Sequence, residues 1–200
     1  MVTRRGLLAS GVAGIGGIAG CAANAPIPDG ADAGGDSGEA KGGDVADDET
    51  ADATRIGLVG DLMLGRSVAD RWAGSGDPDG VWGSTLPRLR ELDALVGNLE
   101  CCVSDRGEQW PDKVYYFRSP PSFAIPALEA AGASFVSLAN NHILDYRESA
   151  LRDTRRHLAE AGIARAGAGR NADAALEPAT FEAGDLTVAA FGLTDQSTAF

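Results

Sequence analysis

The chain has 200 residues, of which 44% are hydrophobic, enough for one domain with additional segments. Its formal net charge is −12, from 29 acidic and 17 basic residues, which argues against a protein that binds nucleic acid through a basic face. Only Lys41 and Lys113 are lysines. An acidic, lysine-poor composition is typical of a salt-adapted organism (a halophile), and a GC-rich genome together with an acidic linker is the alternative explanation.

Residues 1–21 have the features of an export signal that ends in a lipid-attachment site. Arg4 and Arg5 form a twin-arginine pair, and the weakly apolar stretch 6–20 is too short to span a bilayer as a helix. The pair resembles a Tat signal, and the sequence IAGC resembles a lipobox. We therefore expect export by Tat and lipid anchoring through Cys21 to the outer face of the cell membrane. An ordinary signal peptide with an incidental cysteine is the alternative.

The segment 22–53 is predicted to be an acidic, disordered linker. It contains nine acidic residues and one basic residue, mostly among Ala, Gly, Pro and Ser. Such a composition buries too little apolar surface to offset the entropy of ordering, and its charges repel one another. A metal-binding acidic tail is less favoured, because scattered carboxylates form no preorganised cage.

From residue 54 to residue 200 the sequence alternates between strand and helix patterns. Short apolar runs predict strands, the first of them buried, at 54–60, 93–100, 133–141, 163–169 and 186–194. Helices are predicted at 66–74, 85–92, 148–162 and 171–177, and a further helix begins near Pro126 and stops at Gly132. This alternation indicates an α/β fold with a largely parallel sheet covered by helices.

Polar residues directly follow the first three predicted strands. They are Asp61 after the first, Asn98 and Glu100 after the second, and Asn140, Asn141, His142 and Asp145 after the third. Ligands of parallel sheets bind beyond the carboxyl ends of the strands, so these groups are expected at one edge. Their oxygen and nitrogen donors suit one or two divalent ions (Mn, Mg, Zn or Fe), which polarise a phosphoryl or carbonyl oxygen.

Each of these residues also has a structural explanation when it is taken alone. Asp61 is also explained as a helix cap, and Glu100 as a solvated turn residue. Asn140 and Asn141 are tolerated in turns with unusual dihedral angles, and a lone histidine such as His142 is more often structural than catalytic. The recurrence of such groups at successive strand ends is what favours a shared site.

Two further features are predicted to be structural. Cys101 and Cys102 are adjacent, a spacing that rarely permits a disulfide, so we expect them to pack near a strand end. His157 lies in the middle of a predicted helix and is interpreted as an ordinary surface or flank residue.

Several motifs together resemble the CapA family, which is named for capsule synthesis of poly-γ-glutamate. They are GDLMLGR, GNLE, YYFRSPP, SLANNHILDY and the run LRDTRRHLAEAGIARAGAGRNADAALEPATFE, and the similarity covers roughly residues 56–193. The family is similar in fold to calcineurin-like metallophosphoesterases. The resemblance therefore implies a layered αββα sandwich, of which residues 54–200 would carry the N-terminal portion.

The resemblance also implies roles for the residues at the strand ends. Asp61 and Glu100 would be metal-binding carboxylates, and Asn141 would be the metal-ligating asparagine. His142 would protonate a leaving oxygen or stabilise the transition state, and Asp145 would orient His142 and fix its tautomer. The implied substrate contacts are Arg66, Asn98, Arg118 and Asn140. The two arginines would clamp an anionic group, and surface ion pairs are an equally weighted alternative.

Three departures from the family pattern are visible. Phosphoesterases usually have Asp-x-His where Asp61 is followed here by Leu62 and Met63, so one imidazole ligand is missing. The family often has glycine where this chain has Arg147. Family members also continue beyond the point corresponding to Phe200 with a second histidine-containing segment. The expectation is therefore either a fragment or an incomplete site.

Two hypotheses of function follow. The first is a metal-assisted hydrolase or transferase that acts on an anionic surface polymer or a phosphoester. The second is a non-catalytic factor that binds the polymer or assists its export and assembly, with capsule-synthesis membrane proteins as partners. Neither hypothesis involves nucleic acid, and in both the lipid anchor provides the contact with the membrane.

Overall fold

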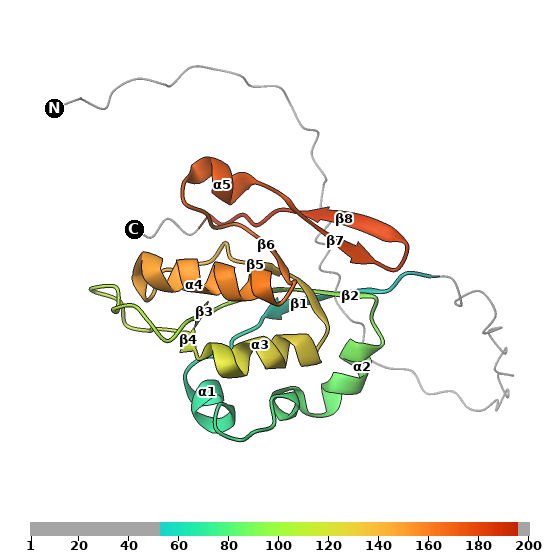
Figure 1. The fold of residues 1–200 in the computed structure, drawn as a ribbon, viewed down its shortest axis with the longest axis horizontal. Coiled ribbons are helices and arrows are strands. Elements are labelled where there is room, and N and C mark those ends of the chain that lie inside the picture. Colours follow the sequence, from blue (N-terminus) through green and yellow to red (C-terminus); the bar gives the residue numbers. More distant parts are fainter. Residues whose placement is uncertain (1–52, 196–200) are drawn as a thin grey trace, which may run out of the picture. The chain divides into compact units, whose positions relative to one another are not determined.

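The computed structural model describes residues 53–195 (Figure 1). The predicted export signal at 1–21 and the predicted linker, apart from its last residue, lie outside this described range. Within residues 53–195, none of the helices combines the length and the apolar character needed to cross a membrane.

Four parallel strands form the central sheet, in the order β1–β2–β5–β6. Their bounds are Ile56–Asp61 for β1, Ala94–Asn98 for β2, Ala133–Ser137 for β5 and Ala164–Ala166 for β6. All four had been predicted from short apolar runs. Their parallel pairing confirms the predicted α/β class, because helices connect strands that run in the same direction.

The first strand differs from its prediction in burial. β1 was expected to be a buried strand, but Leu58 is 77% exposed and Val59 is 40% exposed within the described residues. The reason is its position, because among residues 53–195 β1 is an edge strand that pairs with β2 and with no other strand. Parallel strands are usually covered on both faces and are therefore apolar on both. An apolar run in the sequence consequently does not distinguish an edge strand from a central one.

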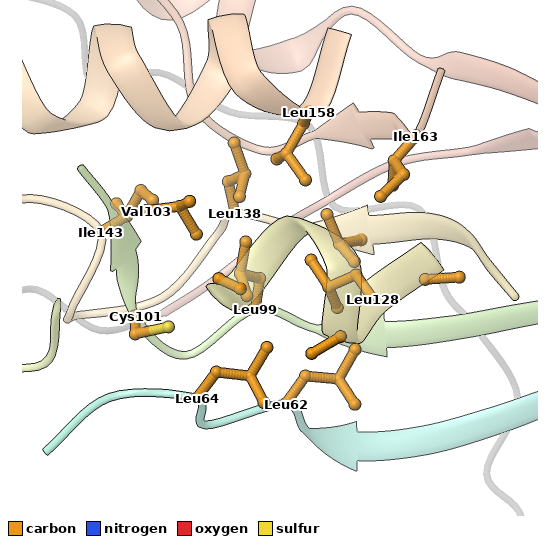
Figure 2. Close-up of a cluster of buried hydrophobic side chains, with 14 of the residues drawn as sticks. Leu62, Leu64, Leu99, Cys101, Val103, Leu128, Leu138, Ile143, Leu158 and Ile163 are labelled. Atoms are coloured by element: carbon orange, nitrogen blue, oxygen red, sulfur yellow. The ribbon is translucent and has the colours of Figure 1, made fainter. Parts of the chain in front are cut away.

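Helices cover one face of the central sheet. α3 (Pro121–Ala130) and α4 (Arg147–Glu160) pack there, and Leu128, Leu138 and Leu158 are fully buried in the cluster between helices and sheet (Figure 2). At about 25 cal/mol for each Å² of apolar surface removed from water, this cluster is the main source of stability.

A β-hairpin, not a helix, covers the other face. β7 (Ala179–Ala183) pairs antiparallel with β8 (Leu186–Ala190) (Figure 1). Phe135 follows the alternation of β5 and points away from the helices, and its ring stacks on that of Phe181 at 5.8 Å between centroids. The predicted helical cover is therefore found on one face of the sheet, whereas the other face is covered by a hairpin whose strand β7 was not predicted.

The shorter elements complete the fold. They are α1 (Ser67–Trp72), the 3-10 helix η1 (Asp79–Thr85), α2 (Leu86–Arg90), α5 (Ala172–Leu176), and the two-residue strands β3 (Cys102–Val103) and β4 (Arg118–Ser119). The helices α1, α2 and α5 confirm their predictions, and Pro87 lies in the first turn of α2, where a missing N–H costs nothing. The strands β3 and β4 were not predicted, since two residues carry no periodic signal.

Helix α3 begins earlier than predicted. The expected start near Pro126 is wrong, because the helix begins at Pro121 after Pro120 in an extended conformation, and Pro126 lies inside it. Proline at the first helical position is favourable, and Phe123 and Leu128 are buried on either side of Pro126. Tertiary packing therefore outweighs the hydrogen bond that Pro126 cannot donate.

Helix α4 has the predicted buried face and the predicted end. Leu151, Thr154 and Leu158 are buried, and Gly162 has a φ of +72°, the left-handed conformation that closes many helices. The N-terminal end is unusual, because Arg147 has a φ of +62°. A residue with a Cβ is strained in this region, where glycine is the favoured residue.

Candidate functional site at the strand ends

The sheet brings the predicted carboxylates and amides together at its carboxyl edge. In the parallel register, Asp61 of β1 lies opposite Asn98 of β2, and Asn98 lies opposite Ser137 of β5. The side-chain amide of Asn98 donates to Asp61 Oδ1 at 2.8 Å and also to Glu100 Oε2. Asp61 therefore does not cap the following helix, and its prediction as part of a strand-end cluster fits this geometry.

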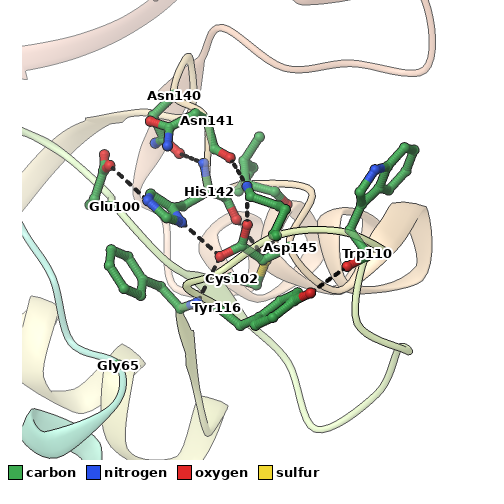
Figure 3. A network of polar contacts seen from close by, with 12 residues as sticks. Gly65, Glu100, Cys102, Trp110, Tyr116, Asn140, Asn141, His142 and Asp145 are labelled. Atoms are coloured by element: carbon green, nitrogen blue, oxygen red, sulfur yellow. Dashed lines mark hydrogen bonds and ion pairs between the residues drawn. The ribbon is translucent and has the colours of Figure 1, made fainter. Parts of the chain in front are cut away.

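Asn140 extends the cluster to the third strand end. Its side-chain amide donates to Asn98 Oδ1 at 3.0 Å and to the carbonyl of Leu99 at 2.9 Å. Its side-chain oxygen accepts from the backbone N–H of His142 at 3.0 Å (Figure 3). Asn140 thus fixes the loop that carries His142 against the end of β2. These contacts go beyond the turn role that was the alternative explanation for Asn140.

His142 lies between two carboxylates. Its Nδ1 is 2.7 Å from Asp145 Oδ2, and its Nε2 is 3.8 Å from Glu100 Oε1 (Figure 3). Because Asp145 accepts at Nδ1, the second ring nitrogen is directed toward Glu100 and can accept or donate a proton there. The ring also stacks on Phe117, with 3.8 Å between centroids and 19° between planes. The predicted orientation of His142 by Asp145 matches this arrangement.

Asp145 is fully buried and has more partners than the sequence suggested. Its carboxylate forms an ion pair with Lys113 and accepts from the backbone N–H of Phe117 at 2.7 Å. Lys113 also donates to the carbonyl of Asn141. Lys113 and Phe117 were missed, because they lie in an irregular loop between β3 and β4. One signal was available in that Lys113 is one of only two lysines in the chain.

A cleft of about 670 Å³ opens at this edge. It is lined by Asp61, Asn98, Glu100, Ala139, Asn140, Asn141, Leu193, Thr194 and Asp195. The predicted contacts Arg66 and Arg118 are not among these residues. Within the described chain their guanidinium groups lie over aromatic rings, with Arg66 5.1 Å from the centroid of Tyr115 and Arg118 4.0 Å from that of Tyr146. Neither arginine forms an ion pair with another residue between 53 and 195, and their role as substrate contacts stays a prediction.

The glycine of the GDLMLGR motif has a steric reason. A Cβ on Gly65 would lie 2.9 Å from the backbone oxygen of Arg118, too close for any side chain. This close approach joins the segment after β1 to β4, which leads into α3. The motif therefore fixes the backbone beside the cleft as well as supplying Asp61.

The electrostatics of the cleft favour a cation. Burial raises the pKa of Glu100, the amide of Asn98 lowers it, and the nearby charge of Asp61 raises it further. No lysine or arginine forms an ion pair with Asp61 or Glu100 in the part of the chain that the structure describes. Two carboxylates held together by one neutral amide form a site at which a bound cation would relieve the repulsion.

The donors fit some divalent ions better than others. Across residues 53–195 there is no group of three or more His, Cys, Asp or Glu side chains placed to hold a metal. A closed zinc cage of nitrogen and sulfur ligands therefore does not fit. Mg²⁺ or Mn²⁺, held by one or two carboxylates with water and substrate oxygens, does fit Asp61 and Glu100. Asn141 lines the same cleft and is the third predicted ligand.

The adjacent cysteines are structural, as predicted. Cys101 and Cys102 are both free and fully buried. The thiol of Cys102 lies 3.1 Å from the carbonyl of Ile143 and 3.3 Å from that of His142. Cys102 therefore packs beneath the His142 loop, while Cys101 belongs to the main hydrophobic core.

The structure thus defines an α/β protein with a polar, carboxylate-containing cleft at the carboxyl ends of its parallel strands. Residues 55–199 match the family described as "Bacterial capsule synthesis protein PGA_cap". The chain belongs to this family, and the predicted resemblance is confirmed.

Similarity to individual proteins points the same way. The chain is 31% identical over 141 residues to the capsule biosynthesis protein CapA of Bacillus anthracis, which covers 69% of this chain and 34% of that protein. It is 26% identical over 148 residues to the PGA biosynthesis protein CapA of Bacillus subtilis (73% and 38%). It is 38% identical over 105 residues to a probable polyglutamine synthesis accessory protein of Mycobacterium tuberculosis (52% and 27%). The matched part thus spans about a third of these relatives.

Proposed function

We propose that this chain takes part in the biosynthesis of a capsule polymer of the poly-γ-glutamate type, with the strand-end cleft as its ligand site. The family membership and the names of the relatives support the polymer. The observation that carries the site is the placement of His142 between Asp145 and Glu100 at the edge of the cleft that Asp61 also lines. We further propose that the domain is part of a layered αββα sandwich, since a β-hairpin covers the sheet face opposite the helices.

The proposed chemistry is metal-assisted hydrolysis or transfer on an anionic polymer or phosphoester. Asp61, Glu100 and Asn141 would hold a divalent ion, which when bound would polarise an oxygen of the substrate. Asp145 holds Nδ1 of His142, so that Nε2 can pass a proton to or from an oxygen in the cleft. Asn98 and Asn140 orient the carboxylates and the loop through their amide groups.

A cation titration tests the site directly. In calorimetry with Mn²⁺, the unmodified chain is expected to bind the ion, and both Asp61→Asn and Glu100→Gln are expected to lose that binding. Asp185→Asn is the matched control, since Asp185 is an exposed carboxylate in the hairpin turn. Cation binding that survives both cleft substitutions would overturn the assignment of the site.

A turnover assay separates enzyme from binding factor. Cleavage of a γ-linked glutamate oligomer and of a phosphodiester would be followed by mass spectrometry, and His142→Gln is expected to lower the rate by about 10²–10⁴. The second candidate, a non-catalytic binding or assembly factor, is favoured by the lack of three grouped His, Cys, Asp or Glu ligands in residues 53–195. Cation binding without turnover of either substrate would select this second candidate.

We also propose that the protein is exported and lipid-anchored at the outer face of the membrane, close to the polymer-synthesis machinery. The support comes from Arg4, Arg5 and the sequence IAGC ending at Cys21. Cys21→Ser is expected to move the protein from the membrane fraction to the soluble fraction. An unchanged distribution would contradict lipid anchoring.

A further inference from the structure

A second pocket lies away from the strand-end cleft and has the opposite charge. Its volume is about 670 Å³, and it lies between α4 and the segment from Gly169 to Glu177. Its lining consists of Leu144, Glu148, Leu151, Arg152, Arg155, Gly169, Arg170, Ala174 and Glu177. Three arginines therefore line one hollow in a chain whose formal net charge is −12.

A carboxylate of the pocket pairs with one of its three arginines and leaves the other two without an ion pair among the described residues. Glu148 forms an ion pair with Arg152 at 3.2 Å, in which both side chains are largely exposed. For Arg155 and Arg170 there is no ion pair with any residue between 53 and 195. Two guanidinium groups thus remain available to a ligand, and guanidinium binds carboxylate through two parallel hydrogen bonds.

A fourth arginine strengthens the positive character of this region. Arg165 lies on β6 between Ala164 and Ala166, which pack toward the hairpin, so its side chain leaves the sheet on the α4 side. Its Nε is buried and has no hydrogen-bond partner in the described part of the chain. Burial, and next the charge of Arg155, lower the pKa of Arg165, which places these two cations near each other.

The position of the pocket suits a long ligand. The loop from Asn140 to Tyr146 borders both hollows, because Asn140 and Asn141 line the strand-end cleft and Leu144 lines the arginine pocket. Arg152 and Arg155 are three residues apart on α4 and so lie on neighbouring positions of one helix face. An extended polyanion can therefore present successive carboxylates to this face.

We propose that the pocket formed by Arg152, Arg155 and Arg170 is a binding site for a carboxylate-rich polymer chain. The choice of a glutamate polymer as the ligand rests on the proposed function, whereas the anion site itself rests on the arginines. This site also explains how an acidic protein holds an acidic polymer, because attraction is local and the rest of the surface repels the chain.

The test is the binding of a fluorescein-labelled γ-linked glutamate decamer to the full chain, followed by anisotropy at low salt. The unmodified chain is expected to bind, and Arg155→Gln and Arg170→Gln are each expected to weaken binding by about tenfold. Arg88→Gln is the matched control, since this arginine on α2 lies outside the pocket. Circular dichroism would verify that each variant remains folded, and Arg170, which is exposed, is the safer substitution.

The outcomes separate the ligand sources and the two proposals. Displacement of the decamer by inorganic phosphate at equal ionic strength would overturn the preference for carboxylates, and unchanged binding in the Arg155→Gln/Arg170→Gln double variant would overturn the site. Without added divalent cation, Asp185→Asn in the hairpin turn, outside both hollows, is expected to leave this binding intact. Failure of the cleft to bind a cation and failure of the pocket to bind the decamer are therefore distinguishable results.

Discussion

Carboxylates occur in two different settings in this molecule. Asp145 and Asp153, below the surface of α4 and its preceding loop, each have a cation as partner, Lys113 and Arg106 respectively. Asp61 and Glu100, at the mouth of the strand-end cleft, both accept from the amide of Asn98 and have no lysine or arginine partner among residues 53–195. The first pair stabilises the fold, and the second pair holds negative charge where a ligand can reach it.

The difference shows how one loop can serve stability and function together. His142 contacts a carboxylate of each kind, since Asp145 binds Nδ1 from below and Glu100 approaches Nε2 from the cleft. The buried carboxylate of Asp145 holds the histidine ring in place, and the carboxylate of Glu100 puts negative charge beside its other nitrogen. Neutralising a carboxylate that is paired with a cation should therefore lower the free energy of unfolding, whereas neutralising Glu100 in the cleft should raise it.

The largest expected effect comes from Asp145. Asp145→Asn leaves Lys113 without its counter-charge at a site where the carboxylate is fully buried, and the free energy of unfolding is expected to fall by about 3–5 kcal/mol. Asp61→Asn, at an exposed position, is expected to change it by less than about 0.5 kcal/mol. Urea unfolding followed by circular dichroism measures both. Equal losses would show that the two settings do not differ.

A smaller effect is expected in the pH dependence of stability. Hydrogen bonds from Arg106 hold the pKa of Asp153 well below its usual value, so its contribution is complete above about pH 4. That contribution is lost as the pH falls from the unfolded-state pKa toward the folded one. Asp153→Asn should therefore flatten the acid side of the curve of unfolding free energy against pH.

Glu100 provides a control, because its pKa is shifted up, whereas that of Asp153 is shifted down. Burial raises its pKa, so the folded state favours its protonated form, and unfolding free energy is lost as the pH rises above about 4.5. Glu100→Gln is expected to stabilise the cation-free protein at pH 7. Both profiles come from urea titrations between pH 3 and pH 8. If Glu100→Gln instead lost stability at pH 7, the ionised carboxylate of Glu100 would not be destabilising the folded protein.

The smallest expected effect concerns the end of the His142 loop. Arg147→Gly removes the strain of a positive φ but also the contact of Arg147 with Trp110, whose ring centroid lies 5.6 Å away. The net expectation is a gain of about 0.5 kcal/mol in the free energy of unfolding. Arg147→Ala loses the contact and keeps the strain, so it should destabilise. Equal effects of the two variants would exclude backbone strain at this position.

Much of the site was predictable because parallel topology converts sequence order into proximity. Asp61, Asn98 and Asn140 follow three strands that pair in register, so their convergence required only correct strand assignments. Lys113 and Phe117 were not predictable, because they reach Asp145 and His142 from an irregular loop. The same limit applies to the exposure of Leu58, which depends on what covers an edge strand.

The arginines illustrate a second limit. Arg66 and Arg118 belong to recognisable motifs, yet their guanidinium groups stack on aromatic rings and do not line the cleft. Arg155 and Arg170 belong to no short motif, and only the packing of α4 beside the segment after β6 brings them together. Motif position therefore predicted which side chains line the cleft better at the strand ends than it did for the arginines.

The burial of Cys101 and Cys102 has a consequence for the redox behaviour of the protein. Burial raises the pKa of Cys101 to about 12 and that of Cys102 to about 11. At pH 7 only ~10⁻⁴ or less of either thiol is ionised, and the thiolate is the form that attacks disulfides and oxidants. Two adjacent thiols can therefore persist unoxidised in an oxidising compartment as well as in a reducing one, without glutathione to protect them.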